Sequence, residues 1–201
     1  MKDKIILDLC GGTGAWSKPY LEAGYDVRNI TLPDLDVRTY KPPDNVYGIL
    51  FAFPCTHFAV SGARWWKEKD VDGRTLEDTK ILTSGLIIIA NCQPFFWVLE
   101  NPVGRLIHWL GKPKMYFNPY DYGNPWTKKT VLWGKFNIPI KNPVKPVGQW
   151  MGRKGKPEIV DHTDEYLSPD WIHKLPPSPD RAMKRSITPS GFARAFYEAN
   201  K

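Results

Sequence analysis

Short apolar runs that alternate with helix-like stretches constrain the first hundred residues of this chain more than any other feature. Runs of this kind end at Gly or Pro and are too short for helices, so they predict buried strands. The predicted strands are 4–9, 25–32, 46–53 and 95–99, and the predicted helices are 16–23 and 76–91. Strands that alternate with helices form parallel sheets covered on both faces. We therefore predict an α/β fold with a mostly parallel sheet.

Chemically distinctive residues follow three of the predicted strands. Cys10, the pair Pro54-Cys55 and Glu100 each stand where an apolar run ends. In open parallel sheets, ligands bind outside the carboxyl ends of the strands. The sequence therefore predicts a functional site at that edge of the sheet.

Composition narrows the class of protein. The longest near-apolar stretch, 85–90, is far below the roughly 18 residues that cross a bilayer, and the first residues lack the apolar core of a signal peptide. Three cysteines with no CxxC pair favour neither a disulfide framework nor a zinc site. We expect reduced thiols, no metal, no membrane, and a cytoplasmic location.

A basic segment follows the predicted strands. Residues 112–156 carry ten Lys or Arg and one acidic residue, so their local net charge of +9 exceeds the +7 of the whole chain. Trp126, Trp133 and Trp150 are interleaved with these charges. This pattern is typical of a surface that binds an anionic polymer. Residues 130–133 are expected to form a further strand, 161–180 an acidic and Pro-rich loop, and 191–200 a terminal helix.

Three short motifs could carry chemistry. Glycines between Asp8 and Gly14, after a strand and before a helix, suit either a cofactor turn or a tight structural turn. Cys55 is either a nucleophile or an inert core thiol, with His57 as a potential general base. Glu100 ends an apolar strand, where it could donate a proton to a ring nitrogen or merely cap a neighbouring helix.

Taken together and in order, these motifs resemble those of the DNA cytosine-5 methyltransferase family, and in particular its short, stand-alone members in bacteria and their viruses. The resemblance covers most of residues 4–140 and returns in 187–200. It is carried by Asp8–Trp16, Phe53–Phe58, Glu100-Asn101, Tyr122–Pro125 and Thr127–Leu132.

The resemblance implies a Rossmann-like fold that binds S-adenosylmethionine. It places Trp16 against the adenine of the cofactor and assigns recognition of the adenine to the pair Asp36-Val37. The cofactor-binding residues that it implies are Asp8, Gly12, Gly14, Trp16, Asp36, Val37, Phe53 and Leu76.

The resemblance also implies a catalytic set of Cys55, Glu100 and Lys128. In this chemistry the thiolate of Cys55 adds to C6 of a flipped-out cytosine, while Glu100 holds N3 and N4. Lys128 falls near the cytosine O2. The methyl group then passes from the sulfonium of S-adenosylmethionine to C5, and loss of the C5 proton expels Cys55.

The chain departs from the family at several positions. Phe53 and Thr56 replace a proline and a glutamine around the cysteine, and Thr31 stands where an acidic residue contacts the cofactor ribose, a role that Asp34 could take over. Lys128 and Lys129 occupy a segment that usually holds arginines, so bidentate geometry is lost. The Gly-Asn of the final motif is missing.

The expected domains are a catalytic unit of 1–140 and 186–201 and an insertion of 141–185 in place of a full target recognition domain. That insertion is either a surface loop over the sheet or a minimal DNA-reading loop. We favour the DNA-reading loop, because donors and flexible glycines are combined in it. Its predicted nucleic-acid-binding residues are Gln149, Arg153, Lys154 and Lys156.

The function expected is therefore DNA cytosine-5 methylation by a monomer acting on double-stranded DNA, in the host cytoplasm if a phage encodes it, as in restriction–modification. Two alternatives stay open: a methyltransferase acting on RNA or on a free pyrimidine nucleotide, and a non-catalytic DNA-binding relative. Retention of both Cys55 and Glu100 speaks against the second, because a binding module needs neither.

Overall fold

The sheet has six strands, most of them parallel. A computed structural model of the chain describes residues 3–146 and 170–201. The order of the strands across the sheet is β2-β1-β3-β4-β6-β5. Strands β1 to β4 run parallel, and β6 is antiparallel to both β4 and β5. The strand bounds are β1 (Ile5–Leu9), β2 (Asp26–Ile30), β3 (Val46–Ala52), β4 (Phe96–Pro102), β5 (Met115–Phe117) and β6 (Thr130–Lys135). The mixed α/β fold predicted from the sequence is confirmed.

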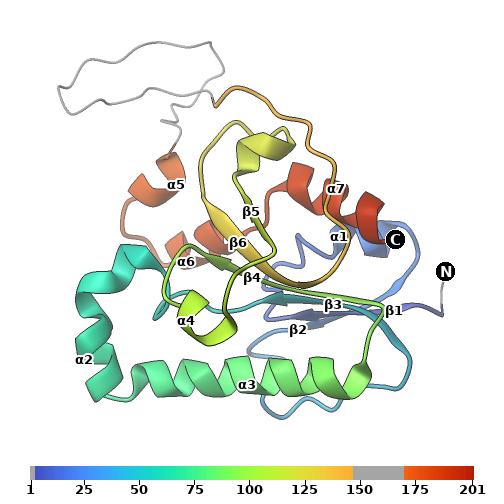
Figure 1. The fold of residues 1–201 in the computed structure, drawn as a ribbon, viewed down its shortest axis with the longest axis horizontal. Coiled ribbons are helices and arrows are strands. Elements are labelled where there is room, and N and C mark those ends of the chain that lie inside the picture. The colour runs from blue at the N-terminus through green and yellow to red at the C-terminus, as the bar shows by residue number, and fades with distance from the viewer. Residues whose placement is uncertain (1–2, 147–169) are drawn as a thin grey trace.

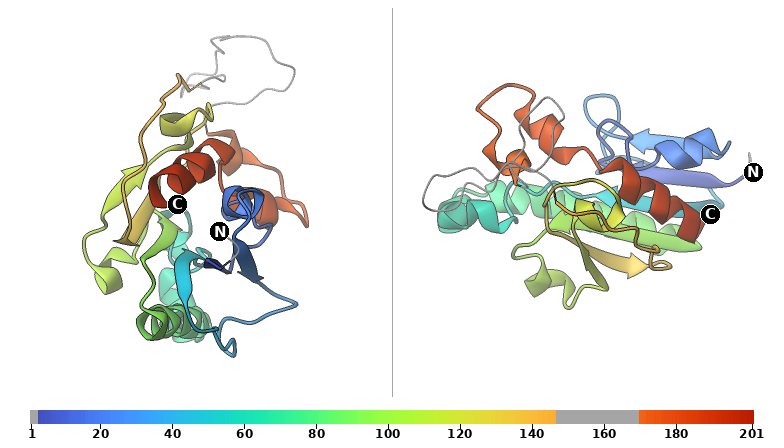
Figure 2. Two further views of the ribbon diagram at one scale, coloured as in Figure 1. Left: turned by 90° about the vertical axis from the view of Figure 1, so that its right-hand side faces the viewer. Right: turned by 90° about the horizontal axis from the view of Figure 1, so that it is seen from above.

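Helices cover both faces of the sheet (Figures 1 and 2). Helices α1 (Lys18–Glu22) and α7 (Ser190–Asn200) lie on one face, and α3 (Arg74–Cys92) lies on the other. The shorter elements are α2 (Trp66–Val71), α4 (Ile107–Leu110), α5 (Trp171–Lys174), α6 (Arg181–Ser186) and two 3₁₀ turns, η1 (Val60–Trp65) and η2 (Pro119–Tyr122). No helix in the described ranges is long and apolar enough to cross a membrane.

Alternation along the strands divides the core into two layers. Successive residues of a strand point to opposite faces, so Ile6 and Leu50 pack toward α7, while Leu7 and Phe51 pack toward α3. Helix α3 approaches the sheet closely because Gly85 has no side chain. A Cβ at this position would lie 2.1 Å from the ring of Phe51.

The last helix is joined to a loop far away in the sequence. The side-chain oxygen of Asn124 accepts a 2.9 Å hydrogen bond from the backbone N–H of Gly191. A Cβ at Gly191 would lie 1.7 Å from the carbonyl oxygen of Tyr122, so only glycine allows this approach. Two segments that carry the family resemblance therefore meet beside the sheet.

Some elements were not expected from the sequence. Strand β5 has only three residues, and α2, α5 and α6 have four to six. Elements this short hold too few turns or alternations for periodicity to reveal them. Helix α1 also ends earlier than expected, with Ala23 rather than Gly24 as its cap residue. Gly24 follows in the left-handed region, at φ +83°.

Candidate active site

A cavity of about 1060 Å³ lies at the carboxyl ends of the parallel strands. The chain passes from β1 to β2 on one side and then returns to β3 on the other, so the strand order reverses between β1 and β3. Such a reversal opens a crevice at the strand ends. The cavity is lined by residues at the ends of four strands, together with part of α5 and α6. The edge of the sheet where the sequence predicts a functional site therefore contains a cavity.

The glycine loop after β1 is held by side chains of the neighbouring strand. Gly12 lines the cavity at φ +54°, a conformation that favours glycine. Its N–H donates to the hydroxyl of Thr31 at 3.3 Å, and its carbonyl accepts from the amide of Asn29 at 2.9 Å. Gly14, at φ +70°, is not among the residues that line the cavity. Thr31 does line it and takes a structural role at the position where the family has an acid, whereas Asp34 does not line it.

Asp8 is not among the residues that line the cavity, and its contact with the cofactor stays a prediction. Alternation along β1 turns its side chain under the glycine loop, where it is fully buried. The hydroxyl of Ser17 donates to its carboxylate at 2.6 Å, and a Cβ at Gly11 would lie 2.3 Å from its carboxyl carbon. Burial raises the pKa of Asp8 to about 6, although the Ser17 hydrogen bonds oppose this shift.

The backbone around Cys55 is fixed on both sides of the thiol. The carbonyl oxygen of Cys55 accepts from the N–H of Phe58 at 3.0 Å and closes a turn. Two residues before the thiol, the carbonyl oxygen of Phe53 accepts from the buried amide of Asn101 at 2.8 Å. Because Asn101 directly follows Glu100 on β4, the same strand end carries the glutamate and orients the cysteine loop.

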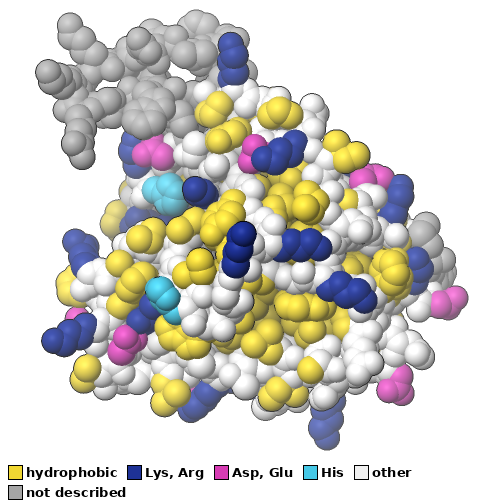
Figure 3. Space-filling model, in the orientation of Figure 1, with side chains coloured by type: hydrophobic (Ala, Val, Ile, Leu, Met, Phe, Trp, Pro, Cys, Tyr) yellow, Lys and Arg dark blue, Asp and Glu magenta, His cyan; other side chains and the backbone are white. Residues whose placement is uncertain are grey.

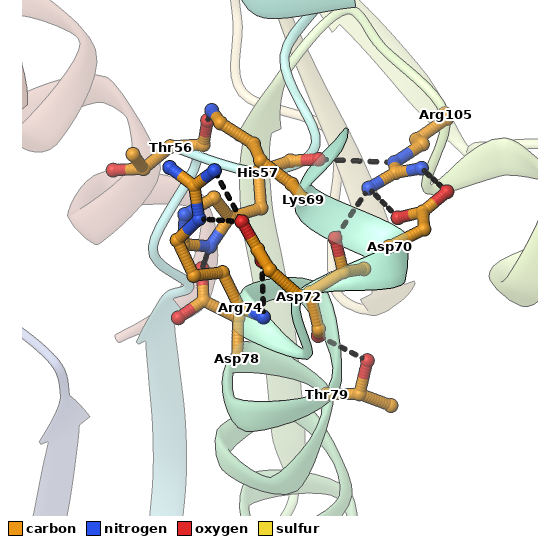
Figure 4. Close-up of polar contacts among 10 residues, drawn as sticks. Thr56, His57, Lys69, Asp70, Asp72, Arg74, Asp78, Thr79 and Arg105 are labelled. Atoms are coloured by element: carbon orange, nitrogen blue, oxygen red, sulfur yellow. Dashed lines mark hydrogen bonds and ion pairs between the residues drawn. The ribbon is translucent and has the colours of Figure 1, made fainter. Parts of the chain in front are cut away.

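Two cationic side chains hold the carbonyls that follow Cys55 (Figure 4). Lys69 donates to the carbonyl oxygen of Thr56 at 2.8 Å, and Arg105 donates to that of His57 at 2.9 Å. Arg105 is itself buried and forms a two-pronged ion pair with Asp70, with both contacts at 2.8 Å. Helix α2 is thereby tied to the cysteine loop.

His57 takes part in this support rather than in the cavity. Its ring nitrogen Nδ1 lies 2.6 Å from a carboxylate oxygen of Asp78, and it is not among the cavity-lining residues. Burial raises the pKa of Asp78, whereas the neighbouring His57 lowers it. His57 therefore joins the cysteine loop to α3.

Cys55, Glu100 and Lys128 all line the cavity, as the resemblance implies. The Cys55 side chain is open to the cavity, yet the surrounding protein and the charge of Glu100 raise its pKa, while Lys128 and Arg185 lower it. Burial also raises the pKa of Glu100, with Lys128 opposing the shift. The carboxyl group of Glu100, the thiol of Cys55 and the ammonium group of Lys128 thus line one site.

Lys128 also connects the sheet to α6. Its ammonium donates to the backbone carbonyl of Arg185 at 2.9 Å. Just before it, the ring of Trp126 meets that of Trp171 of α5 edge to face, with centroids 5.7 Å apart. Segment 170–186 is therefore attached next to the predicted catalytic residues.

Only some of the other residues predicted to bind the cofactor lie together at the cavity. Trp16, Asp36, Val37 and Phe53 line the cavity, whereas Leu76 does not. Leu76 stands in the first turn of α3 with 61% of its surface exposed, and on that helix it is Ile81 that lines the cavity.

Trp16 and Asp36 have protein partners of their own. Trp16 is buried, and its ring packs on Phe192 and Phe196 at centroid distances of 5.9 and 5.6 Å. Only a small part of its ring can therefore contribute to the wall of the cavity. The carboxylate of Asp36 is bound by Arg38 at 2.5 Å, which lowers its pKa and keeps it anionic.

Cavity-lining residues in α5, in α6 and between these helices were missed by sequence reasoning. His173, Ser178, Arg181, Arg185 and Ser186 all line the cavity, although most of this segment was expected to be an acidic loop. The spacing of four residues between Arg181 and Arg185 was the one signal present, since it places both on one helix face. The predicted nucleic-acid-binding residues Gln149, Arg153, Lys154 and Lys156 lie outside the described residues.

Other features of the described residues bear on metals and charge. No group of three or more His, Cys, Asp and Glu side chains that could hold a metal occurs within 3–146 and 170–201.

Figure 3 shows Lys and Arg side chains lying across the face over β4 and β6, among hydrophobic side chains. Some of the basic side chains of the protein therefore lie on that face.

Comparison with known proteins places few constraints on function. No protein-family model matches the chain, and no curated protein matches it. Among solved structures, it is similar to a protein described as a candidate DNA modification methyltransferase encoded within a prophage of E. coli, with a TM-score of 0.45 and 16% identity. The match covers 71% of this chain and 53% of that one, so this chain spans about half the length of its match. A likeness this remote assigns no activity.

Proposed function

We propose that this protein is a DNA cytosine-5 methyltransferase that uses S-adenosylmethionine. The observation that carries the proposal is the cavity that Cys55 and Glu100 share: Cys55 follows β3, and Glu100 lies near the end of the neighbouring parallel strand β4. A glycine loop at Gly12 and the carboxylate of Asp36 line the same cavity. These residue types suit a nucleophile, a proton donor and a nucleoside cofactor.

The size and lining of the cavity fit the cofactor and a base together. Pockets for drug-sized ligands span roughly 300–1,000 Å³, and this cavity has about 1060 Å³. Gly12 and Asp36 would hold the cofactor, with Val37 and Trp16 supplying apolar surface. When bound, S-adenosylmethionine supplies an electrophilic methyl group.

The residues of the chain supply the activation of cytosine. The thiolate of Cys55 forms a bond to C6, and electron density moves toward C5 when N3 is protonated or strongly hydrogen-bonded. Glu100 is suited to that role because burial raises the pKa of its carboxyl group, a shift that favours the protonated form. Lys128 favours the thiolate. After C5 has been methylated, its proton passes to solvent water, and the electron pair of that C–H bond forms the C5–C6 double bond as the bond between sulfur and C6 breaks. N3 returns its proton to Glu100, which restores the ring.

A mechanism-based substrate tests the proposal. Duplex DNA with 5-fluorocytosine should form a stable covalent adduct with Cys55, because fluorine cannot leave as a proton does. Cys55→Ser should abolish the adduct, whereas Cys10→Ser, at another cysteine that lines the cavity, should retain it. Methyl transfer that survives in Cys55→Ala would refute the assignment.

Two further measurements define the substrate and the role of Glu100. Transfer from labelled S-adenosylmethionine should be measured on duplex DNA, RNA and dCMP, and we expect duplex DNA to be the substrate. Glu100→Gln should reduce turnover by about 10²- to 10⁴-fold, since an amide cannot supply the proton. Near-normal turnover would make Glu100 a strand cap.

A further inference from the structure

Two arginines of α6 line the cavity. Arg181 and Arg185 are four residues apart, so they share one face of the helix, and both line the cavity with Cys55. Like charges at this spacing repel each other. Their neighbour Lys184 pairs with Asp180 at 2.7 Å, but within the described ranges no carboxylate forms an ion pair with either arginine.

The surroundings make this arrangement costly in the absence of an anion. The Nε atom of Arg181 is buried and has no hydrogen-bond partner in the described part of the chain. A buried N–H donor that lacks a partner loses hydration without compensation. An anionic ligand would satisfy both guanidinium groups at once and would remove their mutual repulsion.

A third cation, Lys128, and the hydroxyl groups of two serines line the cavity together with the two arginines. Lys128 lines the same cavity, and its hydrogen bond to the Arg185 carbonyl holds the end of α6 against the predicted catalytic residues. Arg185 and Cys55 line the same cavity, and the charge of Arg185 lowers the pKa of the thiol. Ser178 and Ser186, on either side of the arginines, also line the cavity.

We propose that Arg181 and Arg185, together with Lys128, form a phosphate-binding subsite for the nucleotide whose base lies against Cys55. Planar guanidinium groups bind phosphate oxygens through paired hydrogen bonds, which isolated lysines cannot do. This inference rests on the proposed function and adds that α6 holds the substrate backbone. The phosphate belongs either to a polynucleotide or to a free nucleotide, and the two share this chemistry.

Binding measurements on single-residue variants test the subsite. Arg181→Gln and Arg185→Gln should each weaken binding of a fluorescent duplex oligonucleotide by about tenfold, as expected when a charge-assisted hydrogen bond is removed. The salt dependence of log K should become shallower by about one unit for each phosphate that the variant no longer neutralises. Lys184→Gln is the matched control, because that lysine lies on the same helix and pairs with Asp180, and it should change affinity less than twofold.

Competition identifies the source of the phosphate. Strong protection of Cys55 from alkylation by dCMP but not by deoxycytidine, absent in Arg185→Gln, would identify a free nucleotide. Weakened duplex binding without such protection by dCMP would identify the polymer backbone. Either result supports the subsite.

The subsite and the proposed function can fail separately. Arginine variants that match Lys184→Gln in affinity and salt slope would overturn the subsite. So would variants that weaken S-adenosylhomocysteine binding in calorimetry while leaving duplex binding unchanged, since the arginines would then serve the cofactor carboxylate. If the wild-type protein forms no adduct with 5-fluorocytosine DNA, the proposed function fails, and the salt slopes still decide whether α6 binds phosphate.

Discussion

The buried side-chain amide of Asn101 donates a 2.8 Å hydrogen bond to the carbonyl oxygen of Phe53, two residues before Cys55. This bond joins the ends of β4 and β3, so the strand that carries Glu100 also orients the loop that carries the thiol. The distance between the Cys55 thiol and the Glu100 carboxyl group is thereby set by strand pairing and by one side chain, not by the loop alone.

Replacing Asn101 should loosen this connection. In Asn101→Ala the Phe53 carbonyl remains buried without a donor, so we expect a loss of about 1–3 kcal/mol in the free energy of unfolding. Adduct formation at Cys55 should also slow. Urea unfolding and adduct kinetics measure the two effects, with the exposed Asn91→Ala as control. Unchanged adduct kinetics in a destabilised Asn101→Ala variant would show that Asn101 stabilises the fold but does not orient Cys55.

Arg105 should act on Cys55 through the loop. Arg105→Lys keeps a positive charge but cannot contact Asp70, Thr75 and the His57 carbonyl together, as the guanidinium does. We expect a loss of about 1–3 kcal/mol in stability and a fall in kcat that exceeds any change in the KM for DNA. The exposed Arg64→Lys is the control. A change confined to the melting temperature would show that Arg105 only supports the fold.

The pH dependence of thiol reactivity should depend on Lys128. Its positive charge lowers the pKa of Cys55, so Lys128→Gln should raise that pKa further above its ordinary value. The iodoacetamide reaction of Cys55, followed by peptide mass spectrometry, should then begin at higher pH than in the wild type. Lys129→Gln, at the adjacent exposed residue, should leave the profile in place. Superimposable profiles for the two variants would contradict this prediction.

Asp8 should make stability decrease as pH rises. Its pKa is about 6 in the folded protein and 3.8 in its ordinary state, so the folded state holds the proton more tightly. This contribution is fully present below about pH 4 and is lost as pH rises through about 6, for a total of about 3 kcal/mol. Relative to Asp8→Asn, the wild type should therefore lose stability between pH 4 and 7.

Urea unfolding at several pH values measures this difference. The exposed Asp34→Asn is the control and should show no comparable trend. A constant difference in unfolding free energy between the wild type and Asp8→Asn across this range would show that Asp8 titrates normally in the folded protein.

Local pattern was sufficient to locate much of the fold and part of the site. The apolar runs predicted β1, β2, β3 and β4, and residues such as Cys55 and Glu100 could be placed at strand ends without a structure. This succeeds because alternation, chain breaks at Gly and Pro, and the position of a residue after a strand are properties of neighbouring residues.

The direction of each side chain and the distant partners were decided only by tertiary packing. Asp8 belongs to the cofactor motif in sequence, yet strand alternation buries it beneath Gly11. Arg185 lies 130 positions after Cys55 and in a helix too short to predict, yet it lines the same cavity. No local preference specifies such a contact, since it exists only after the hydrogen bond from Lys128 and the packing of Trp126 on Trp171 have attached α5 and α6 to the edge of the sheet.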